Sequence, residues 1–184
     1  LSMNHALMQG AGSEWPVLPL YIVEPEYWSQ PDVSHRHYQF MSECLAELRD
    51  DLAARGQPLI LRVGAARDVL DQLSNQVRIR LILSHEETGN SWTFERDKAV
   101  QAWCWERGVP WTEIWQNGVV RRLKNRNGWA RNWSQRMHAP MSDGPLSLQP
   151  LPELEPGSFP IAGDLGLIED GCKYRQRGGR RAGL

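Results

Sequence analysis

Residues 79–115, IRLILSHEETGNSWTFERDKAVQAWCWERGVPWTEIW, contain a complete strand–helix–strand pattern. The β-branched run Ile79–Ser84 predicts a strand, and residues 92–107 predict a helix that ends at Gly108. The run Pro110–Trp115 predicts the next strand. Strands joined by a helix through short connections are parallel and have right-handed crossovers, so this stretch predicts an α/β fold.

The preceding residues repeat the pattern. Strands are predicted at Pro16–Val23 and Leu59–Val63, with a helix over Ser34–Arg55 between them and a short helix after Gly64. The longer helix has apolar residues spaced three and four apart, which form one buried stripe: Tyr38, Met41, Leu45, Leu48 and Leu52. The chain therefore predicts a three-layer α/β sandwich with a parallel, Rossmann-like sheet.

Composition excludes several classes of protein. The 184 residues carry 21 Lys+Arg against 22 Asp+Glu, so no overall field attracts a polyanion. No apolar run is long enough for a membrane span, and the first residues do not resemble a signal peptide. Three scattered cysteines predict neither a disulfide framework nor a zinc site. We expect a cytoplasmic protein with no membrane partner and no bound metal.

Charge is unevenly distributed after the fourth predicted strand. Residues 119–142 contain six Lys+Arg and no acid, while residues 139–163 hold six of the twelve prolines. The basic stretch is typical of a docking surface, a contact with DNA phosphates or a merely solvated face, and these three alternatives stay open. The proline-rich stretch predicts an extended segment with little regular structure.

Ligands of parallel α/β sheets bind beyond the carboxyl ends of the strands. This rule selects the loops Glu24–Trp28, Gly64–Arg67 and His85–Trp92. The third loop places one imidazole, two carboxylates and two small polar residues within six positions, which favours a binding site. The alternative is a polar loop that caps the following helix at Asn90 or Ser91. Trp103 and Cys104, which continue the helix stripe, are expected in the core.

Several of these motifs resemble one known family. The run SHEETGNSWTFERDKAVQAWCWERGVPW (84–111), followed by QNGVVRRL (116–123), resembles the N-terminal α/β domain of the photolyase/cryptochrome family, and most of all bacterial DNA photolyases. VLPLYIVEPEYW (17–28) is similar to the second strand and loop of that domain. LSMNHAL (1–7) and GGRRAGL (178–184) resemble the stretch after the family's Arg-Asp-Leu-Arg motif and the start of its helical flavin-binding domain.

The resemblance implies a domain at residues 1–137 and a linker at 138–184 that leads to a helical FAD-binding domain outside this chain. The family's first strand is missing, so we expect the natural gene product to start upstream. The full-length protein is expected to be a light-driven DNA repair flavoprotein, a cyclobutane pyrimidine dimer photo-lyase acting on damaged DNA. This chain then holds no catalytic residue and is inactive alone. The alternatives are a cryptochrome-like blue-light photoreceptor, or a scaffold domain without a second chromophore.

Many members of the family bind a light-harvesting antenna chromophore (folate, deazaflavin or flavin) in this domain. The resemblance and the loop rule together select the candidate chromophore-binding residues Glu24, His85, Glu86, Glu87, Thr88, Trp92 and Arg96. Trp92-Thr93 occupies the positions of the folate-binding Asn-Glu pair, and Glu86 or Glu87 would have to replace that carboxylate. The candidates for contact with the helical domain or DNA are Arg121, Arg122, Arg126 and Arg131.

Overall fold

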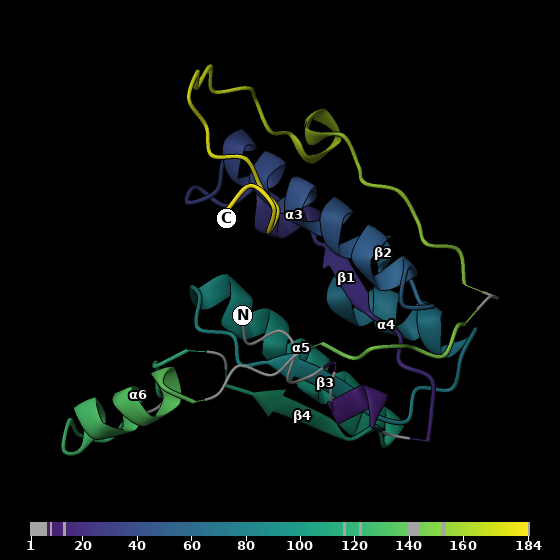
Figure 1. Cartoon of the computed structure of the whole chain (residues 1–184), viewed down its shortest axis with the longest axis vertical. Coiled ribbons are helices and arrows are strands. Elements are labelled where there is room, and N and C mark those ends of the chain that lie inside the picture. Colours follow the sequence, from purple (N-terminus) through teal and green to yellow (C-terminus); the bar gives the residue numbers. More distant parts are fainter. Residues whose placement is uncertain are drawn as a thin grey trace. The chain divides into compact units, whose positions relative to one another are not determined.

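The computed structural model describes residues 7, 9–12, 14–115, 117–121, 123–139, 144–151 and 154–183 (Figure 1). The similarity noted for residues 1–6 and the candidate Arg122 lie outside the described residues. The chain forms two compact units. Unit 1 consists of residues 1–14 and 79–145, and unit 2 of residues 15–78 and 146–184.

Unit 2 is built on two parallel strands, β1 (Leu20–Val23) and β2 (Ile60–Val63), which pair in register from Leu20 opposite Ile60. Its helices are α2 (Pro25–Trp28), α3 (His35–Ala53) and α4 (Ala66–Ser74), and a 3₁₀ turn, η1, covers Ala162–Leu165. The predicted strand at Pro16–Val23 is shorter than expected, because Pro16 and Pro19 have no N–H group to donate to a ladder.

Unit 1 contains the strand–helix–strand pattern of residues 79–115. Strand β3 (Ile82–His85) pairs in parallel with β4 (Trp111–Ile114), and α5 (Ser91–Arg107) connects them. Gly108 ends α5 in the left-handed conformation, as predicted. Strand β3 begins three residues later than expected and includes His85, which the sequence placed in the loop. A further helix, α6, covers Trp129–Met137.

The parallel pairing confirms the α/β class. The core of unit 2 joins Val23 and Leu61 of the two strands to Trp28, Tyr38 and Leu165. The rings of Trp28 and Tyr38 meet edge to face, with centroids 5.0 Å apart. In unit 1, the predicted core residues Trp103 and Cys104 are both buried. Among the described residues, no helix has the length and apolar composition needed to span a membrane.

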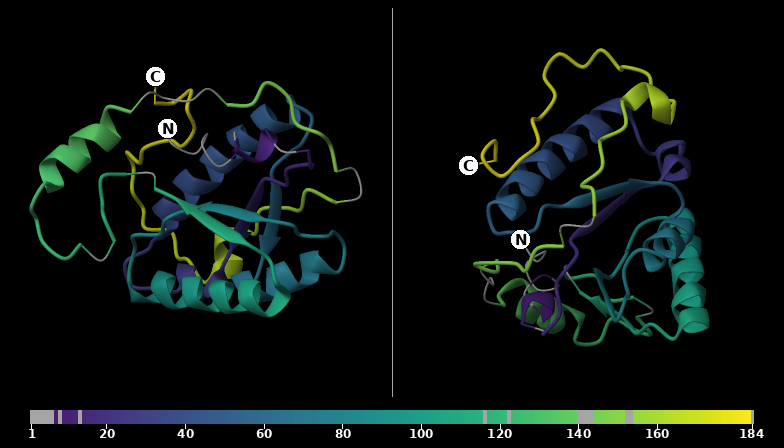
Figure 2. Two further views of the ribbon diagram at one scale, coloured as in Figure 1. Left: turned by 90° about the horizontal axis from the view of Figure 1, so that it is seen from below. Right: turned by 90° about the vertical axis from the view of Figure 1, so that its right-hand side faces the viewer.

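The proline-rich segment after residue 145 is fastened along unit 2 by backbone groups (Figure 2). The Leu148 N–H donates to the Arg55 carbonyl, and the Leu61 N–H donates to the Pro156 carbonyl. The buried Gln57 side chain accepts from the Leu151 N–H at 2.6 Å. The segment is extended and irregular, as predicted, and the domain boundary expected at residue 138 stays a prediction.

Leu45→Ala is expected to lower the free energy of unfolding by about 2–3 kcal/mol, since Leu45 is buried on the inner face of α3. The same change at the half-buried Leu48 leaves a smaller cavity and costs less, about 1 kcal/mol. Urea denaturation followed by circular dichroism measures both. Equal losses of unfolding free energy at the two positions would contradict the difference in burial between Leu45 and Leu48.

Candidate antenna site

The loop between β3 and α5 is ordered by its own side chains. The Asn90 side chain accepts a hydrogen bond from the Thr93 N–H at 3.1 Å, which caps the first turn of α5. The Thr93 hydroxyl donates to the Asn90 carbonyl at 2.9 Å. A cap at Asn90 or Ser91 was the alternative interpretation of this loop, and the structure places the cap at Asn90.

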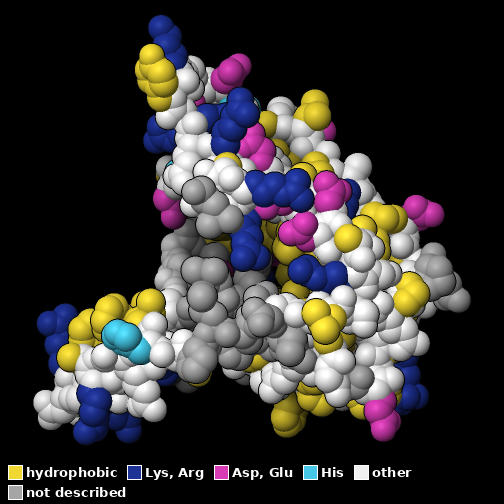
Figure 3. All heavy atoms as spheres, viewed as in Figure 1, with side chains coloured by type: hydrophobic (Ala, Val, Ile, Leu, Met, Phe, Trp, Pro, Cys, Tyr) yellow, Lys and Arg dark blue, Asp and Glu magenta, His cyan; other side chains and the backbone are white. Residues whose placement is uncertain are grey.

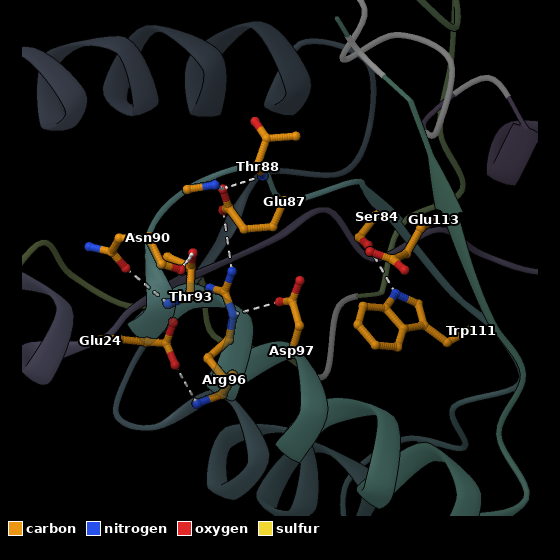
Figure 4. A network of polar contacts seen from close by, with 12 residues as sticks. Glu24, Ser84, Glu87, Thr88, Asn90, Thr93, Arg96, Asp97, Trp111 and Glu113 are labelled. Carbon is orange, nitrogen blue, oxygen red and sulfur yellow. Dashed lines mark hydrogen bonds and ion pairs between the residues drawn. The ribbon is translucent and has the colours of Figure 1, made fainter. Parts of the chain in front are cut away.

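Glu87 folds back over this loop (Figure 4). Its Oε1 atom accepts hydrogen bonds from the N–H groups of Thr88 and Gly89, both at 2.8 Å. Its Oε2 atom lies 3.3 Å from Nη2 of Arg96. A Cβ atom at Gly89 would lie 2.8 Å from Oγ1 of Thr93, so the turn leaves little room for a larger residue. The Glu87 carboxylate thus ties the loop to α5.

A cluster of charges surrounds Arg96 and Arg121. Nε of Arg96 donates to Asp97 at 2.9 Å, and Nη2 of Arg121 lies 2.7 Å from Glu113 of β4. Glu86 and Asp97 lie farther from Arg121, at 3.6 and 4.0 Å. We call this group the carboxylate cluster: Glu86, Glu87, Asp97 and Glu113 with Arg96 and Arg121. Four carboxylates face two guanidinium groups, so the cluster has an excess of acceptors.

The surroundings of the cluster change the pKa values of two of its members, Asp97 and Arg121. Burial raises the pKa of Asp97, although the charge of Arg96 and its hydrogen bond oppose this shift, while Glu113 and Glu87 add to it. The hydrogen bond to Glu113 raises the pKa of Arg121, which stays a cation. The Oε1 atom of Glu113 is buried and accepts no hydrogen bond from the described residues. A buried acceptor of this kind is costly, and a donor on a ligand would satisfy it.

The strand register places Glu113 opposite Ser84, near the carboxyl ends of β3 and β4. Two residues earlier in β4, Nε1 of Trp111 donates to the Ser84 hydroxyl at 2.9 Å. An aromatic side chain also adjoins the cluster, because the Cζ atom of Arg96 lies 6.0 Å from the centroid of the Trp92 ring. Acceptors and an aromatic surface therefore meet at one edge of this sheet.

The structure brings only some of the predicted chromophore-binding residues together. Glu86, Glu87 and Arg96 meet in the cluster, while Trp92 and Thr88 adjoin it. His85 is the last residue of β3. Glu24 belongs to unit 2, where its buried carboxylate accepts from the Ala66 N–H at 2.9 Å, at the start of α4. This contact gives Glu24 a structural role.

Two residues of the carboxylate cluster were not among the candidates selected from the sequence. Asp97 directly follows the candidate Arg96, and Glu113 lies near the end of the predicted strand Pro110–Trp115. Glu113 lies inside this strand and not in the loop after it, so the strand-end rule did not select it. Arg121 was a candidate for contact with DNA or the helical domain, but the structure pairs it with Glu113.

The basic segment after β4 carries an exposed apolar side. Trp129, Trp133 and Met137 of α6 are exposed, and Figure 3 shows hydrophobic and basic side chains gathered on this helix. Arg136 attaches the helix to the end of β4: its guanidinium lies 5.2 Å from the Trp115 ring and donates to the Val119 carbonyl at 2.9 Å. The candidates Arg126 and Arg131 are exposed.

The fold and this strand-end cluster define an α/β domain of the Rossmann-like class. The chain belongs to the DNA photolyase family, whose family model matches residues 1–139. This match confirms the resemblance to the photolyase/cryptochrome family. The chain is 25% identical over 159 residues to the rice (Oryza sativa subsp. japonica) protein "Cryptochrome DASH, chloroplastic/mitochondrial". That alignment covers 82% of this chain and 26% of the rice protein.

Solved structures of the family have the same fold. The Synechocystis sp. PCC6803 cryptochrome superposes with a TM-score of 0.76 at 15% identity, covering 98% of this chain and 41% of that protein. An archaeal photolyase from Sulfolobus tokodaii superposes with a TM-score of 0.64 at 22% identity, covering 100% of this chain and 41% of that protein. The archaeal protein is described as containing two FAD molecules, with the implication of a novel light-harvesting cofactor. The chain thus spans less than half the length of these relatives.

Proposed function

We propose that this chain is the antenna-chromophore domain of a light-driven DNA repair flavoprotein, a cyclobutane pyrimidine dimer photolyase. Family membership supports the class of protein. The observation that carries the antenna role is the carboxylate cluster at the carboxyl ends of β3 and β4, with the unsatisfied Oε1 of Glu113. FAD and damaged DNA would bind through a helical domain in cis, outside this chain, and catalysis would occur there.

The residues of the cluster fit a flat heterocycle with N–H donors. Glu113 would accept a hydrogen bond from such a ring, and Trp92 would offer an aromatic face. Folates, deazaflavins and flavins all have this donor chemistry, and the second FAD of the archaeal relative supports a flavin. When bound, the chromophore would absorb light and pass excitation energy to FAD. Arg96 and Glu87 would keep the loop in place.

Repair is tested on the full-length gene product that contains this chain, purified in the dark. We expect illumination to remove dimers from a dimer-containing oligonucleotide, with no loss in a dark control. A protein with verified reduced FAD that leaves the dimer intact under light would contradict repair. It would instead favour the second candidate, a blue-light photoreceptor, which the name cryptochrome DASH of the rice relative supports.

The antenna role is tested by Glu113→Gln, which keeps the shape of the side chain and removes its charge. Loss of a charge-assisted hydrogen bond is expected to weaken chromophore retention about tenfold. The absorbance ratio of antenna to FAD in the purified full-length protein measures retention. Glu95→Gln is the matched control, since Glu95 is exposed on α5 and pairs with Lys98. Equal ratios in the two variants would contradict this site, and a protein with no second chromophore would favour a scaffold role.

A further inference from the structure

The last residues of the described chain lie along α3. We call residues 172–183 the strap (Figure 2). Arg175 makes a two-pronged contact with the Glu43 carboxylate, with Nη1 3.0 Å from Oε2 and Nη2 hydrogen-bonded to Oε1. The Gly178 N–H donates to the same carboxylate at 2.7 Å. One acid of α3 therefore binds both a side chain and the backbone of the strap.

The next turn of α3 continues the contact. The Arg180 N–H donates to Oε1 of Glu47 at 2.8 Å, and the Arg181 N–H donates to the same atom at 3.2 Å. Between these acids, Sγ of Cys44 accepts from the Gly179 N–H at 3.1 Å. Successive N–H groups that converge on carboxylates form an anion-binding backbone arrangement.

The acids on α3 are spaced to receive this strap. Glu43, Glu47 and Asp51 follow one another at intervals of four residues, so they form an acidic row on one face of the helix. Like charges at this spacing repel, and cationic or N–H partners relieve the repulsion. The hydrogen bonds from Arg175 and Gly178 hold the pKa of Glu43 below its usual range. Asp51 lies 3.7 Å from the Arg181 guanidinium.

Close approach of the strap depends on glycine. A Cβ atom on Gly178 would lie 2.1 Å from the Phe40 carbonyl oxygen, so a larger residue would push the strap off the helix. Hydrophobic burial adds little, because no residue of the strap is buried and Tyr174 is 96% exposed. Charge-assisted hydrogen bonds thus supply most of the attraction, and salt screens exposed interactions of this kind.

We propose that residues 172–183 are a detachable strap, which the acidic row of α3 holds by charge and backbone hydrogen bonds and which rising ionic strength releases. Release uncovers the face of α3 around Cys44 and frees the cationic side chains of the strap. This switch goes beyond the proposed antenna function and does not depend on it. It concerns unit 2 alone.

Hydrogen exchange of the backbone amides at residues 178–181 tests the strap directly, because these groups donate to α3. In the wild-type chain, we expect exchange to become about tenfold faster between low salt and about 1 M salt, where the screening length falls to about 3 Å. In the double variant Glu43→Ala/Glu47→Ala, exchange should be fast already at low salt. Asp50→Ala is the matched control, since Asp50 is an exposed acid on α3 outside the acidic row.

Two further measurements make the test decisive. Protection of the Leu61 amide, which donates to the Pro156 carbonyl, verifies that unit 2 is folded in each variant. Alkylation of Cys44 should accelerate when the strap is released, while the buried Cys104 of unit 1, which lies outside the strap, serves as an internal reference whose reactivity should not change. The proposal would be overturned if the amides of residues 178–181 exchanged equally fast in the double variant and in Asp50→Ala. Wild-type exchange that salt does not change would also overturn it, a result that needs no variant.

Discussion

Trp103→Ala is expected to destabilise unit 1 by about 3–5 kcal/mol, because it empties the volume of a fully buried indole. Trp103 is 1% exposed and lies on α5, the helix that connects β3 to β4. A loss of this size approaches the whole stability of a small domain, so much of the variant should be unfolded at room temperature. Urea denaturation followed by tryptophan fluorescence and circular dichroism measures the change.

The chain provides its own control two residues away. Trp105 is 89% exposed on the same helix, so Trp105→Ala should change the free energy of unfolding by less than about 0.5 kcal/mol. Both variants remove the same side chain from the same secondary structure. A comparable loss at both positions would mean that Trp105 is covered in solution, and a small loss at Trp103 would contradict the packing of α5.

Arg121→Ala is expected to lower the free energy of unfolding by about 2 kcal/mol. It removes the cation that hydrogen-bonds to Glu113 and faces Glu86 and Asp97. The remaining carboxylates would repel one another in a partly desolvated place. Arg131→Ala is the control, since Arg131 is exposed and forms no ion pair in the part of the chain that the structure describes. Equal stabilities of the two variants would show that the cluster contributes little to folding.

The pH dependence of Arg121→Ala follows from the same charges. Burial already raises the pKa of Asp97 in the folded state, and loss of a nearby cation raises it further. A folded-state pKa above the unfolded value means that the folded state binds more protons, so stability rises as the pH falls through that range. The penalty of Arg121→Ala should therefore be smaller near pH 5 than near pH 7. A penalty that grows on acidification would contradict this electrostatic origin.

Local patterns predicted most of the secondary structure. The apolar stripe of residues 34–55 became α3, Asn90 became the cap of α5 and Gly108 ended that helix. The ends of strands were less accurate: β1 begins at Leu20 and β3 includes His85. A strand ends where its partner stops pairing, and the partner is far away in the sequence. An apolar, β-branched run therefore identifies a strand better than it locates the ends of that strand.

The candidate site also has one part that the sequence predicted and one part that it did not. The loop of Glu86 and Glu87 was predicted, because polar residues after a parallel strand lie at the edge where ligands bind. The pairing of Arg121 with Glu113 was not predicted, and Arg121 was instead assigned to an interface. Neither residue reveals its partner, since a charge in a sequence is equally consistent with solvent, DNA or a neighbouring acid. Glu24 carried the same ambiguity, and its buried carboxylate accepts from the backbone of α4.

The sequence by itself determined the α/β class, the order of the four strands and of helices α3, α4 and α5, the core positions of Trp103 and Cys104, and the family. Short-range periodicity and capping encode these features, because they involve residues a few positions apart. The sequence did not identify α2, which lies in the predicted loop Glu24–Trp28, or α6. Only the tertiary structure decided which charges meet: Arg121 with Glu113 in unit 1, and Arg175 with Glu43, 132 residues earlier, in unit 2. Such contacts depend on where the chain returns after folding, which local patterns do not specify.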